Sequence, residues 1–230
     1  MDQKFNTKDR MNFFGIKPTK SLGQNFLNDI SVVQEIVYSA NITKEDIVVE
    51  VGPGLGVMTD LLADEAGLVI AVEIDKNLIP PLTAICDMHD NIELINGDIL
   101  KVNIREIVAQ RLAESDGKFK NVKVVANLPY YITTPIIFSF LEDKMPALKS
   151  MTFMVQKEVA DRLTALPGNK NSGAITYSVY YYAEAEKIID VPNNSFIPEP
   201  EVTSSVIKLT LRKSSPVEVN SEEILFKLII

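Results

Sequence analysis

The sequence has little of several side chains on which enzymes often rely. Its 230 residues contain one cysteine, Cys86, one histidine, His89, and no tryptophan. The chain therefore cannot form an internal disulfide or a zinc cluster of cysteine and histidine ligands. We predict no metal site, and a chemistry that uses other groups.

Long apolar runs are also missing. No run approaches the roughly 20 residues that a helix needs to cross a bilayer, and the start of the chain lacks the apolar block of a secretion signal. These absences predict a cytoplasmic protein without membrane contact. The hydrophobic fraction of 46% is nevertheless enough for one sizeable core.

Positive charge is scarce as well. The formal net charge of -8 argues against a chain that coats nucleic acid indiscriminately, because phosphate binding relies on lysine and arginine. Residues 1–20 are the exception, with five basic and two acidic side chains: Lys4, Lys8, Arg10, Lys17 and Lys20 against Asp2 and Asp9. We assign this stretch as a basic N-terminal arm that contacts a polyanion; a solvated tail is the alternative.

Apolar strand-like runs alternate with helical patterns along the chain, which is typical of a parallel sheet covered by helices. We expect strands at 46–52, 68–75, 92–100, 121–128, 150–156 and 202–212. We expect helices at 57–66, 134–145 and 157–166. The segment 173–191 is open, since its tyrosines favour a strand whereas its length allows a helix and then a strand. The pattern predicts an α/β Rossmann-like fold with a mostly parallel seven-stranded sheet and helices on both faces.

Polar groups follow each of the first four predicted strands, where an open sheet of this kind binds its ligands. In chain order they are Glu50 with the glycine turn Gly52, Gly54 and Gly56, then Glu73 with Asp75, then Asp98, then Asn127. Each acid alone is explained equally well as a solvated carboxylate at a strand end. Their succession favours a ligand site.

The glycine turn narrows the ligand class. A dinucleotide fingerprint has a third glycine where this chain has Val57, so the turn lets a ligand approach without the usual pyrophosphate cradle. Glu73 stands where a carboxylate accepts hydrogen bonds from both ribose hydroxyls, and Asp98 could accept one from the adenine amine. A ligand with adenine and ribose but no phosphate fits, and S-adenosylmethionine is such a ligand.

Seven segments carry a resemblance that extends from Ser21 to Arg212. They are SLGQNFLND, VEVGPGLGVMT, AVEID, NGDIL, NLPYYITTP, MVQKEVADRL and FIPEPEV. Their order and spacing resemble the ribosomal RNA adenine N6,N6-dimethyltransferases of the KsgA type, which act on small-subunit ribosomal RNA. The resemblance implies a methyltransferase catalytic domain over 21–212 and a cofactor site formed by Asn25, Leu27, Gly52, Gly54, Glu73, Asp98, Ile99 and Asn127.

The segment NLPYYITTP predicts the catalytic groups. If the Asn127 side-chain oxygen and the Leu128 carbonyl accept hydrogen bonds from an adenine amino group, they direct its lone pair and stabilise positive charge on the nitrogen. Pro129 stiffens the turn, and Tyr130 offers a face for a base that has been flipped out of its stack. By the resemblance, Phe196 closes over the same base; a hydrophobic plug under a loop is the alternative.

We therefore predict S-adenosylmethionine-dependent N6-dimethylation of adenosines in small-subunit ribosomal RNA, by a monomer that acts within a pre-ribosomal subunit. The similar macrolide-resistance methyltransferases act on large-subunit RNA and share part of the pattern. Two rivals are a ribosome-assembly or transcription factor that acts mainly by binding, and an NAD-dependent oxidoreductase. The sequence departs from the family pattern at Ser172, where a tyrosine is usual, and at Glu201, where many members have a lysine.

The last residues, 213–230, read as a linker and the start of a further helix. Asn220 is the predicted N-cap, with Glu223 three positions later, and Ile224, Leu225, Leu228, Ile229 and Ile230 form an apolar stripe. Because family members continue into a helical domain, we expect a catalytic domain truncated at its C-terminus. The alternative is a short form whose final helix docks on the sheet domain.

Overall fold

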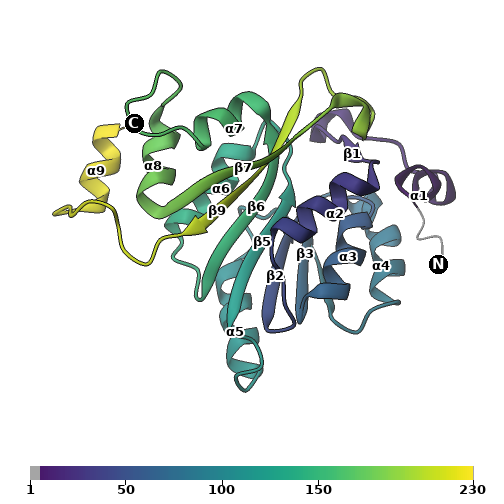
Figure 1. The fold of residues 1–230 in the computed structure, drawn as a ribbon. Helices are drawn as coiled ribbons and strands as arrows, with labels where there is room; N and C mark the ends of the chain where they lie inside the picture. The colour runs from purple at the N-terminus through teal and green to yellow at the C-terminus, as the bar shows by residue number, and fades with distance from the viewer. Residues whose placement is uncertain (1–5, 230) are drawn as a thin grey trace.

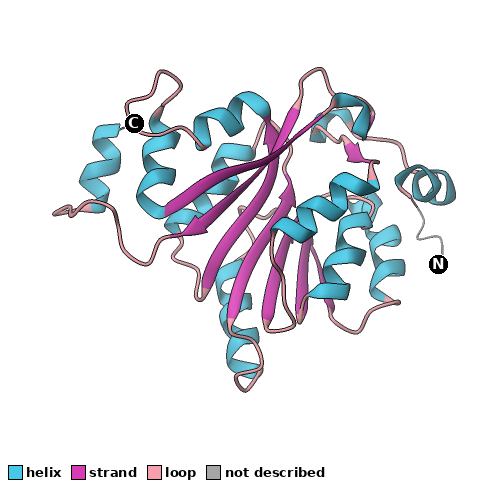
Figure 2. Cartoon of the chain, in the orientation of Figure 1, coloured by secondary structure: helices cyan, strands magenta, loops and turns pink. Residues whose placement is uncertain are grey.

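The structure is a computed structural model that describes residues 6–229, with the side chains of residues 223, 228 and 229 outside that description. The described residues form a seven-stranded sheet flanked by helices (Figure 1, Figure 2). The strand order is β4-β3-β2-β5-β6-β9-β7. The strands are β2 (Asp46–Val51), β3 (Leu68–Glu73), β4 (Ile92–Asn96), β5 (Asn121–Asn127), β6 (Leu148–Gln156), β7 (Ala183–Val191) and β9 (Ser204–Leu211).

Strand directions confirm the predicted sheet. The pairs from β4 through to β6 are parallel, whereas β9 runs antiparallel to both of its neighbours, β6 and β7. Chain order reverses between β2 and β5, which is the switch point at which open α/β sheets bind ligands. The inserted antiparallel β9 departs from the strand order of dinucleotide-binding domains.

The helices cover both faces of the sheet (Figure 1). Val48 and Val69 pack with residues of α2 and α3, whereas Val49 and Val124 pack with residues of α5 and α6, because successive strand side chains point to opposite faces. The helices are α1 (Thr7–Phe14), α2 (Ile30–Ser39), α3 (Val57–Glu65), α4 (Ile79–Cys86), α5 (Ile104–Glu114), α6 (Thr133–Glu142), α7 (Lys157–Leu163), α8 (Ala174–Tyr182) and α9 (Glu222–Ile229), with short 3-10 turns at Lys20–Leu22, Lys76–Leu78 and Asn193–Ser195. None of them within residues 6–229 is both long and apolar enough to span a bilayer.

The segment 173–191, which the sequence left open, forms a helix followed by a strand, α8 and then β7. A two-stranded sheet was not predicted. Its strands are β1 (Phe26–Leu27) and β8 (Phe196–Ile197), which pair antiparallel with Leu27 opposite Phe196. This pairing joins the LGQNFL segment to the FIPEP segment, 170 positions apart in the chain.

Helix α1 lies within the predicted basic arm. Asn6 caps it by accepting a hydrogen bond from the Asp9 N–H at 2.9 Å. Arg10, one of the basic residues of the arm, is only 6% exposed, whereas Lys8 is exposed. Lys4 and Asp2 lie outside the described residues. Part of the charge of the arm is therefore used inside the protein.

Helix α9 begins one residue later than predicted. Ser221, not Asn220, is its N-cap, because the Ser221 hydroxyl accepts a hydrogen bond from the Ile224 N–H at 3.3 Å. Serine caps a helix as well as asparagine does, so local preference does not choose between the two positions. The Phe226 ring stacks on Tyr182 of α8 with ring centroids 5.4 Å apart. Of the remaining predicted residues, the side chains of Glu223, Leu228 and Ile229, and all of Ile230, lie outside the described part.

Candidate functional site

A cleft opens at the carboxyl ends of β2, β3 and β5, on the edge where the sheet reverses its chain order. It encloses about 930 Å³ of empty space, its open mouth included. Most of the predicted site residues line it: Asn25, Leu27, Gly52, Gly54, Glu73, Asn127, Leu128, Pro129 and Tyr130. Strand ends that are far apart in the sequence thus supply one wall of a single site.

The glycine turn between β2 and α3 forms the floor of the cleft. Gly52, Gly54 and Gly56 all have positive φ angles, of 66°, 61° and 76°. A Cβ atom at Gly52 would meet nothing within 4 Å, whereas one at Gly54 would lie 3.3 Å from the Phe26 ring. Gly52 therefore leaves open space beside the backbone, into which a ligand can pack.

Glu73, at the end of β3, is fixed by two backbone donors. Its Oε1 accepts a hydrogen bond from the Asp75 N–H at 2.8 Å, and its Oε2 accepts one from the Gly54 N–H at 3.2 Å. Burial raises the pKa of Glu73, and these two donors oppose the rise. The carboxylate keeps further lone pairs for a ligand, since each oxygen can accept more than one hydrogen bond.

Asp75, two residues after Glu73, bonds mainly to side chains of the protein itself. Its Oδ2 accepts hydrogen bonds from Gln24 Nε2 at 2.7 Å and from the Thr19 hydroxyl at 3.3 Å, and its Oδ1 accepts one from the Asn77 N–H at 3.0 Å. Burial acts to raise the pKa of Asp75, but these donors outweigh it and the pKa is lowered. Asp75 thereby ties the segment around Gln24 to the end of β3.

Glu50 lies on the α2 and α3 face of β2 and is fully buried. Neither of its carboxyl oxygens has a hydrogen-bond partner among the described residues. Burial raises the pKa of Glu50 to about 8; the nearby Thr59 hydroxyl opposes the rise, although its geometry falls short of a hydrogen bond, and the charge of Glu73 adds to it. The group therefore holds a proton at neutral pH.

Asn127 and Leu128 present two acceptors at the end of β5. Asn127 Nδ2 donates to the Asn25 carbonyl at 3.3 Å, which orients the amide and leaves its Oδ1 without a donor among the described residues. The Leu128 N–H donates to the Met154 carbonyl at 3.1 Å, and the Leu128 carbonyl likewise accepts nothing from the described residues. Both oxygens thus keep acceptor capacity, and both residues line the cleft.

Comparison with known proteins assigns the chain to a family. The model of a family described as ribosomal RNA adenine dimethylase matches residues 15–229. The chain belongs to this family. A ribosomal RNA small subunit methyltransferase A of Lachnoclostridium phytofermentans is 52% identical over 91% of the chain and 71% of that protein, and one of Listeria monocytogenes is 46% identical over 96% and 74%.

Two solved structures place this dimethylase chain among RNA methyltransferases. A dimethyladenosine transferase from Plasmodium falciparum is similar with a TM-score of 0.75 and 30% identity, over 89% of the chain and 69% of that protein. The 23S rRNA methyltransferase ErmE is similar with a TM-score of 0.72 and 28% identity, over 89% and 77%. The predicted methyltransferase fold is thus confirmed.

Three predicted site residues of the dimethylase chain lie away from the cleft lining. Asp98 Oδ1 caps a turn by accepting from the Leu100 N–H at 3.1 Å, and Ile99 packs at the edge of the core. Phe196 is 2% exposed and belongs to the same buried cluster as Met154. In this placement the Phe196 ring is packed in the core. Adenine contacts by Asp98 and Phe196 stay predictions.

The cleft also contains residues that sequence reasoning missed. Thr7 of α1, Gln24 and Tyr131 line it, and Tyr131 is 61% exposed. One side of the Tyr131 ring lies against Gly23, where an added Cβ would approach it to 3.3 Å. The doubled tyrosine of NLPYYITTP was the available signal for Tyr131; nothing local placed Thr7 here.

The donor set of the cleft fits S-adenosylmethionine better than a metal ion. Residues 6–229 hold no group of three or more histidine, cysteine, aspartate or glutamate side chains that could bind a metal. The fixed carboxylate of Glu73 suits a ribose, and the open space at Gly52 suits a ligand close to the backbone.

Proposed function

We propose that this dimethylase chain transfers methyl groups from S-adenosylmethionine to the N6 nitrogen of adenosines in small-subunit ribosomal RNA, two methyl groups per base. The observation that carries the proposal is the pair of unengaged acceptors, Asn127 Oδ1 and the Leu128 carbonyl, in one cleft with Glu73 and the glycine turn. The relatives at 52% and 46% identity are named for the small subunit, whereas the large-subunit enzyme is 28% identical. The small subunit is therefore the favoured substrate.

Glu73, Gly52, Gly54 and Asn25 would hold the cofactor. When bound there, the cofactor supplies an electrophilic methyl group on a sulfonium. Glu73 enters this task already oriented by two N–H donors, so binding does not have to fix its side chain. We further propose that the adenine end of the cofactor extends toward Asp98 and Ile99, which then complete the site.

Asn127 and Leu128 act on the nucleophile. An adenine amino group is a weak nucleophile because its lone pair is delocalised into the ring. Two acceptors that take its two N–H hydrogens direct the lone pair out of that plane and stabilise the positive charge that develops on nitrogen. Pro129 follows directly and has no N–H that would compete for these acceptors.

Tyr130 is held in place for stacking. Its hydroxyl forms a hydrogen bond of 2.8 Å with the Ser204 hydroxyl of β9, which fixes the ring beside the acceptor pair. A base within a helix cannot reach this position, so the target base has to leave its stack. A stacking role for Phe196 additionally requires its ring to leave the core.

The setting of the reaction is also part of the proposal. Residues 21–212 carry the catalysis, with Thr7 contributed from the basic arm 1–20, and 213–230 add a linker and α9. We propose a cytoplasmic monomer that needs no metal ion and acts on RNA within a pre-ribosomal small subunit.

A second candidate, an assembly factor that keeps the fold but acts by binding, predicts no turnover. Incubation of the chain with labelled S-adenosylmethionine and under-methylated small subunits separates the two. Label that enters the RNA in more than one equivalent per chain supports the enzyme. Tight subunit binding without label in the RNA would support the binding factor and refute our proposal.

A further inference from the structure

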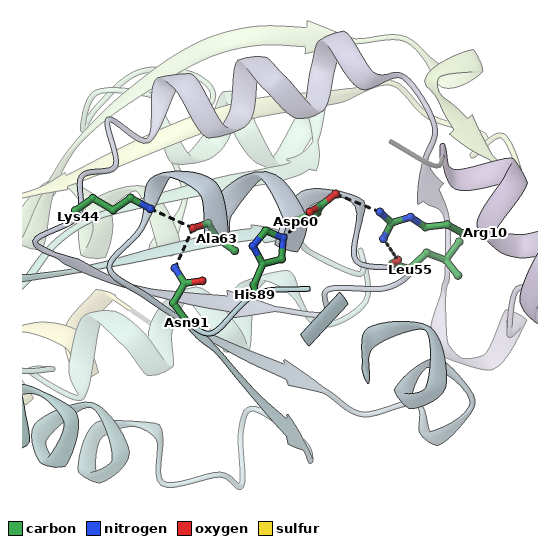
Figure 3. A network of polar contacts seen from close by, with 7 residues as sticks. All are labelled: Arg10, Lys44, Leu55, Asp60, Ala63, His89 and Asn91. Atoms are coloured by element: carbon green, nitrogen blue, oxygen red, sulfur yellow. Dashed lines mark hydrogen bonds and ion pairs between the residues drawn. The ribbon is translucent and has the colours of Figure 1, made fainter. Parts of the chain in front are cut away.

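Helix α3 begins at the glycine turn. Polar side chains from α1, from the loop between α2 and β2 and from the loop between α4 and β4 form hydrogen bonds or ion pairs with it (Figure 3). At its C-terminal end, Asn91 Nδ2 donates to the Ala63 and Ala66 carbonyls at 2.9 and 3.0 Å, and Lys44 Nζ donates to the Ala66 carbonyl at 3.1 Å. These bonds satisfy carbonyls that the helix itself leaves unpaired, so they are accounted for as capping.

The contacts at the other end of α3 are not capping of this kind. Asp60, in the first turn, is 2% exposed and lies between two cations or potential cations (Figure 3). Its Oδ2 is 3.4 Å from Arg10 Nη2, and its Oδ1 is 2.7 Å from His89 Nε2. Arg10 comes from α1, and His89 comes from the loop between α4 and β4.

Arg10 also contacts the glycine turn itself. Its Nη1 donates a hydrogen bond to the Leu55 carbonyl at 2.9 Å, and a Cβ atom at Gly56 would lie 3.4 Å from the same nitrogen. One guanidinium therefore bridges the turn and the first turn of the helix that follows it. The planar fork of donors that arginine offers reaches both acceptors from two different nitrogens.

A buried Arg10–Asp60 ion pair costs desolvation energy that a purely structural contact between α1 and α3 would not need. Burial lowers the pKa of Arg10, and the neighbouring Asp60 carboxylate opposes that effect. Apolar side chains could attach α1 to α3 without desolvating a charge, and replacement of buried ion pairs by apolar residues is often neutral or stabilising. A hydrogen bond to one particular carbonyl of the turn does what apolar contact cannot, because it fixes the path of the backbone.

The same face of α1 also contacts the Asn25–Leu27 segment, which lines the cleft as well. Thr7 lies three positions before Arg10, hence on the same side of the helix, and is 1% exposed. Its hydroxyl donates to the Leu27 carbonyl, and Thr7 lines the cleft next to Leu27. Helix α1 thus holds the glycine turn through Arg10 and the Asn25–Leu27 segment through Thr7.

We propose that Arg10 is a positioning residue for the cofactor site, through which α1 couples the glycine turn to the Asn25–Leu27 segment. The proposal rests on the proposed function, in which both segments hold S-adenosylmethionine. A cofactor that contacts both segments binds best when α1 keeps them at a fixed position relative to each other. By linkage, the cofactor then stabilises the docked α1 as much as α1 stabilises the bound cofactor.

The test combines calorimetry with amide hydrogen exchange on the 230-residue chain. For Arg10→Met we expect S-adenosylmethionine binding to weaken about tenfold, the typical effect of one charge-assisted hydrogen bond, and for Arg10→Lys a smaller loss. Lys8→Met is the matched control, since it removes one exposed positive charge from the same helix, and its affinity should stay within about twofold. In the wild type, saturating cofactor should slow exchange of the α1 amides, and in Arg10→Met it should not.

Two results would overturn the inference alone: an Arg10→Met chain that binds S-adenosylmethionine as tightly as the wild type, or wild-type α1 amides whose exchange the cofactor leaves unchanged. If Arg10→Met does not fold, Arg10→Lys and the wild-type exchange experiment decide the question. A wild-type chain that binds no S-adenosylmethionine would instead refute the proposed function, and the inference with it.

Discussion

Glu50 and Glu73, two buried glutamates on the neighbouring strands β2 and β3, differ in their hydrogen bonding. Glu73 accepts from two backbone N–H groups, whereas the oxygens of Glu50 have no partner in the described part of the chain. A carboxylate with fixed donors is prepared to bind a ligand while ionised. A carboxyl without donors is stable in its place only while it keeps its proton.

Removing Glu73 should act on cofactor affinity. Glu73→Ala deletes ground-state ribose contacts and leaves the acceptor pair at the end of β5 untouched. We expect S-adenosylmethionine binding to weaken about 10- to 100-fold, as for hydrogen bonds to a charged group, with turnover at saturating cofactor little changed. Glu45→Ala is the control, because Glu45 directly precedes β2, at the amino ends of the parallel strands and away from the cleft. Calorimetry and saturation kinetics would contradict the assignment if turnover fell while affinity held.

Glu50 should make the stability of the chain depend on pH. Its pKa is about 8 in the folded state against an ordinary value of 4.5. Between these values the folded chain holds a proton that the unfolded chain has lost, so its contribution to stability falls as pH rises, by at most about 1.4 kcal/mol per pH unit. Below about pH 4.5 and above about pH 8 this contribution no longer changes.

The variant Glu50→Gln cannot titrate and removes this dependence. Relative to the wild type, it should therefore gain stability as pH is raised from 5 to 8, whatever constant offset the buried amide introduces. Thermal unfolding of both proteins at several pH values in this window measures the effect. A difference in melting temperature that stays the same at pH 5 and pH 8 would contradict a raised pKa for Glu50.

Asn127 is the side chain on which the proposed catalytic mechanism depends most, because its Oδ1 is one of the two acceptors for the target amino group. Asn127→Ala should reduce the rate of methyl transfer at saturating cofactor by about 10²- to 10³-fold or more, the typical effect of removing one preorganised hydrogen-bonding group. The Asn127 side chain is expected both to position the target amino group and to stabilise the positive charge on its nitrogen. The melting temperature should change little. A rate above a tenth of the wild-type value would refute the role of the acceptor pair.

At the scale of elements, the strands were predictable and several helices were not. Strands β3 and β5 are apolar runs that end in polar groups, so the sequence alone also located Glu73 and Asn127. Helix α4 has two prolines in its first turn, which read as breakers although that turn tolerates them. Helix α2 is rich in β-branched residues that favour strands, and its helical state is set by packing on the sheet.

Other parts of the site depend on contacts that no local pattern encodes. The pairing of β1 with β8 joins two-residue strands, too short to give a periodic signal, and Thr7 reaches the cleft only because α1 docks on α3 and α4. The prediction for Asp98 came from its place at a strand end and that for Phe196 from resemblance, and neither residue is in the cleft lining. Sequence pattern therefore located most of the strand-end residues of the site and missed Thr7, which α1 supplies.

The turn between α3 and β3 sets how closely this helix approaches the sheet. A Cβ atom at Gly67 would lie 2.3 Å from the Lys44 carbonyl oxygen and 2.6 Å from the Phe119 ring. Gly67→Ala should therefore lower the free energy of unfolding by about 2–3 kcal/mol through overpacking. Gly173→Ala, where an added Cβ meets nothing within 4 Å, should cost less than about 1 kcal/mol. Equal denaturation midpoints for the two variants would contradict this.

At the scale of the whole molecule, the chain brings a net charge of -8 to a polyanionic substrate, and the charge of Arg10 is buried inside it. Recognition of ribosomal RNA therefore depends on where the exposed basic groups lie and on the shape of the cleft, since overall attraction is absent.

Nucleoside analysis of the product tests the central claim most directly. Under-methylated small subunits and, in parallel, large subunits would be incubated with the chain and S-adenosylmethionine, and their RNA would be digested and analysed by mass spectrometry. We expect N6,N6-dimethyladenosine to accumulate in small-subunit RNA and not in large-subunit RNA. Methylation of another atom or base, or dimethyladenosine in large-subunit RNA alone, would contradict the proposed function.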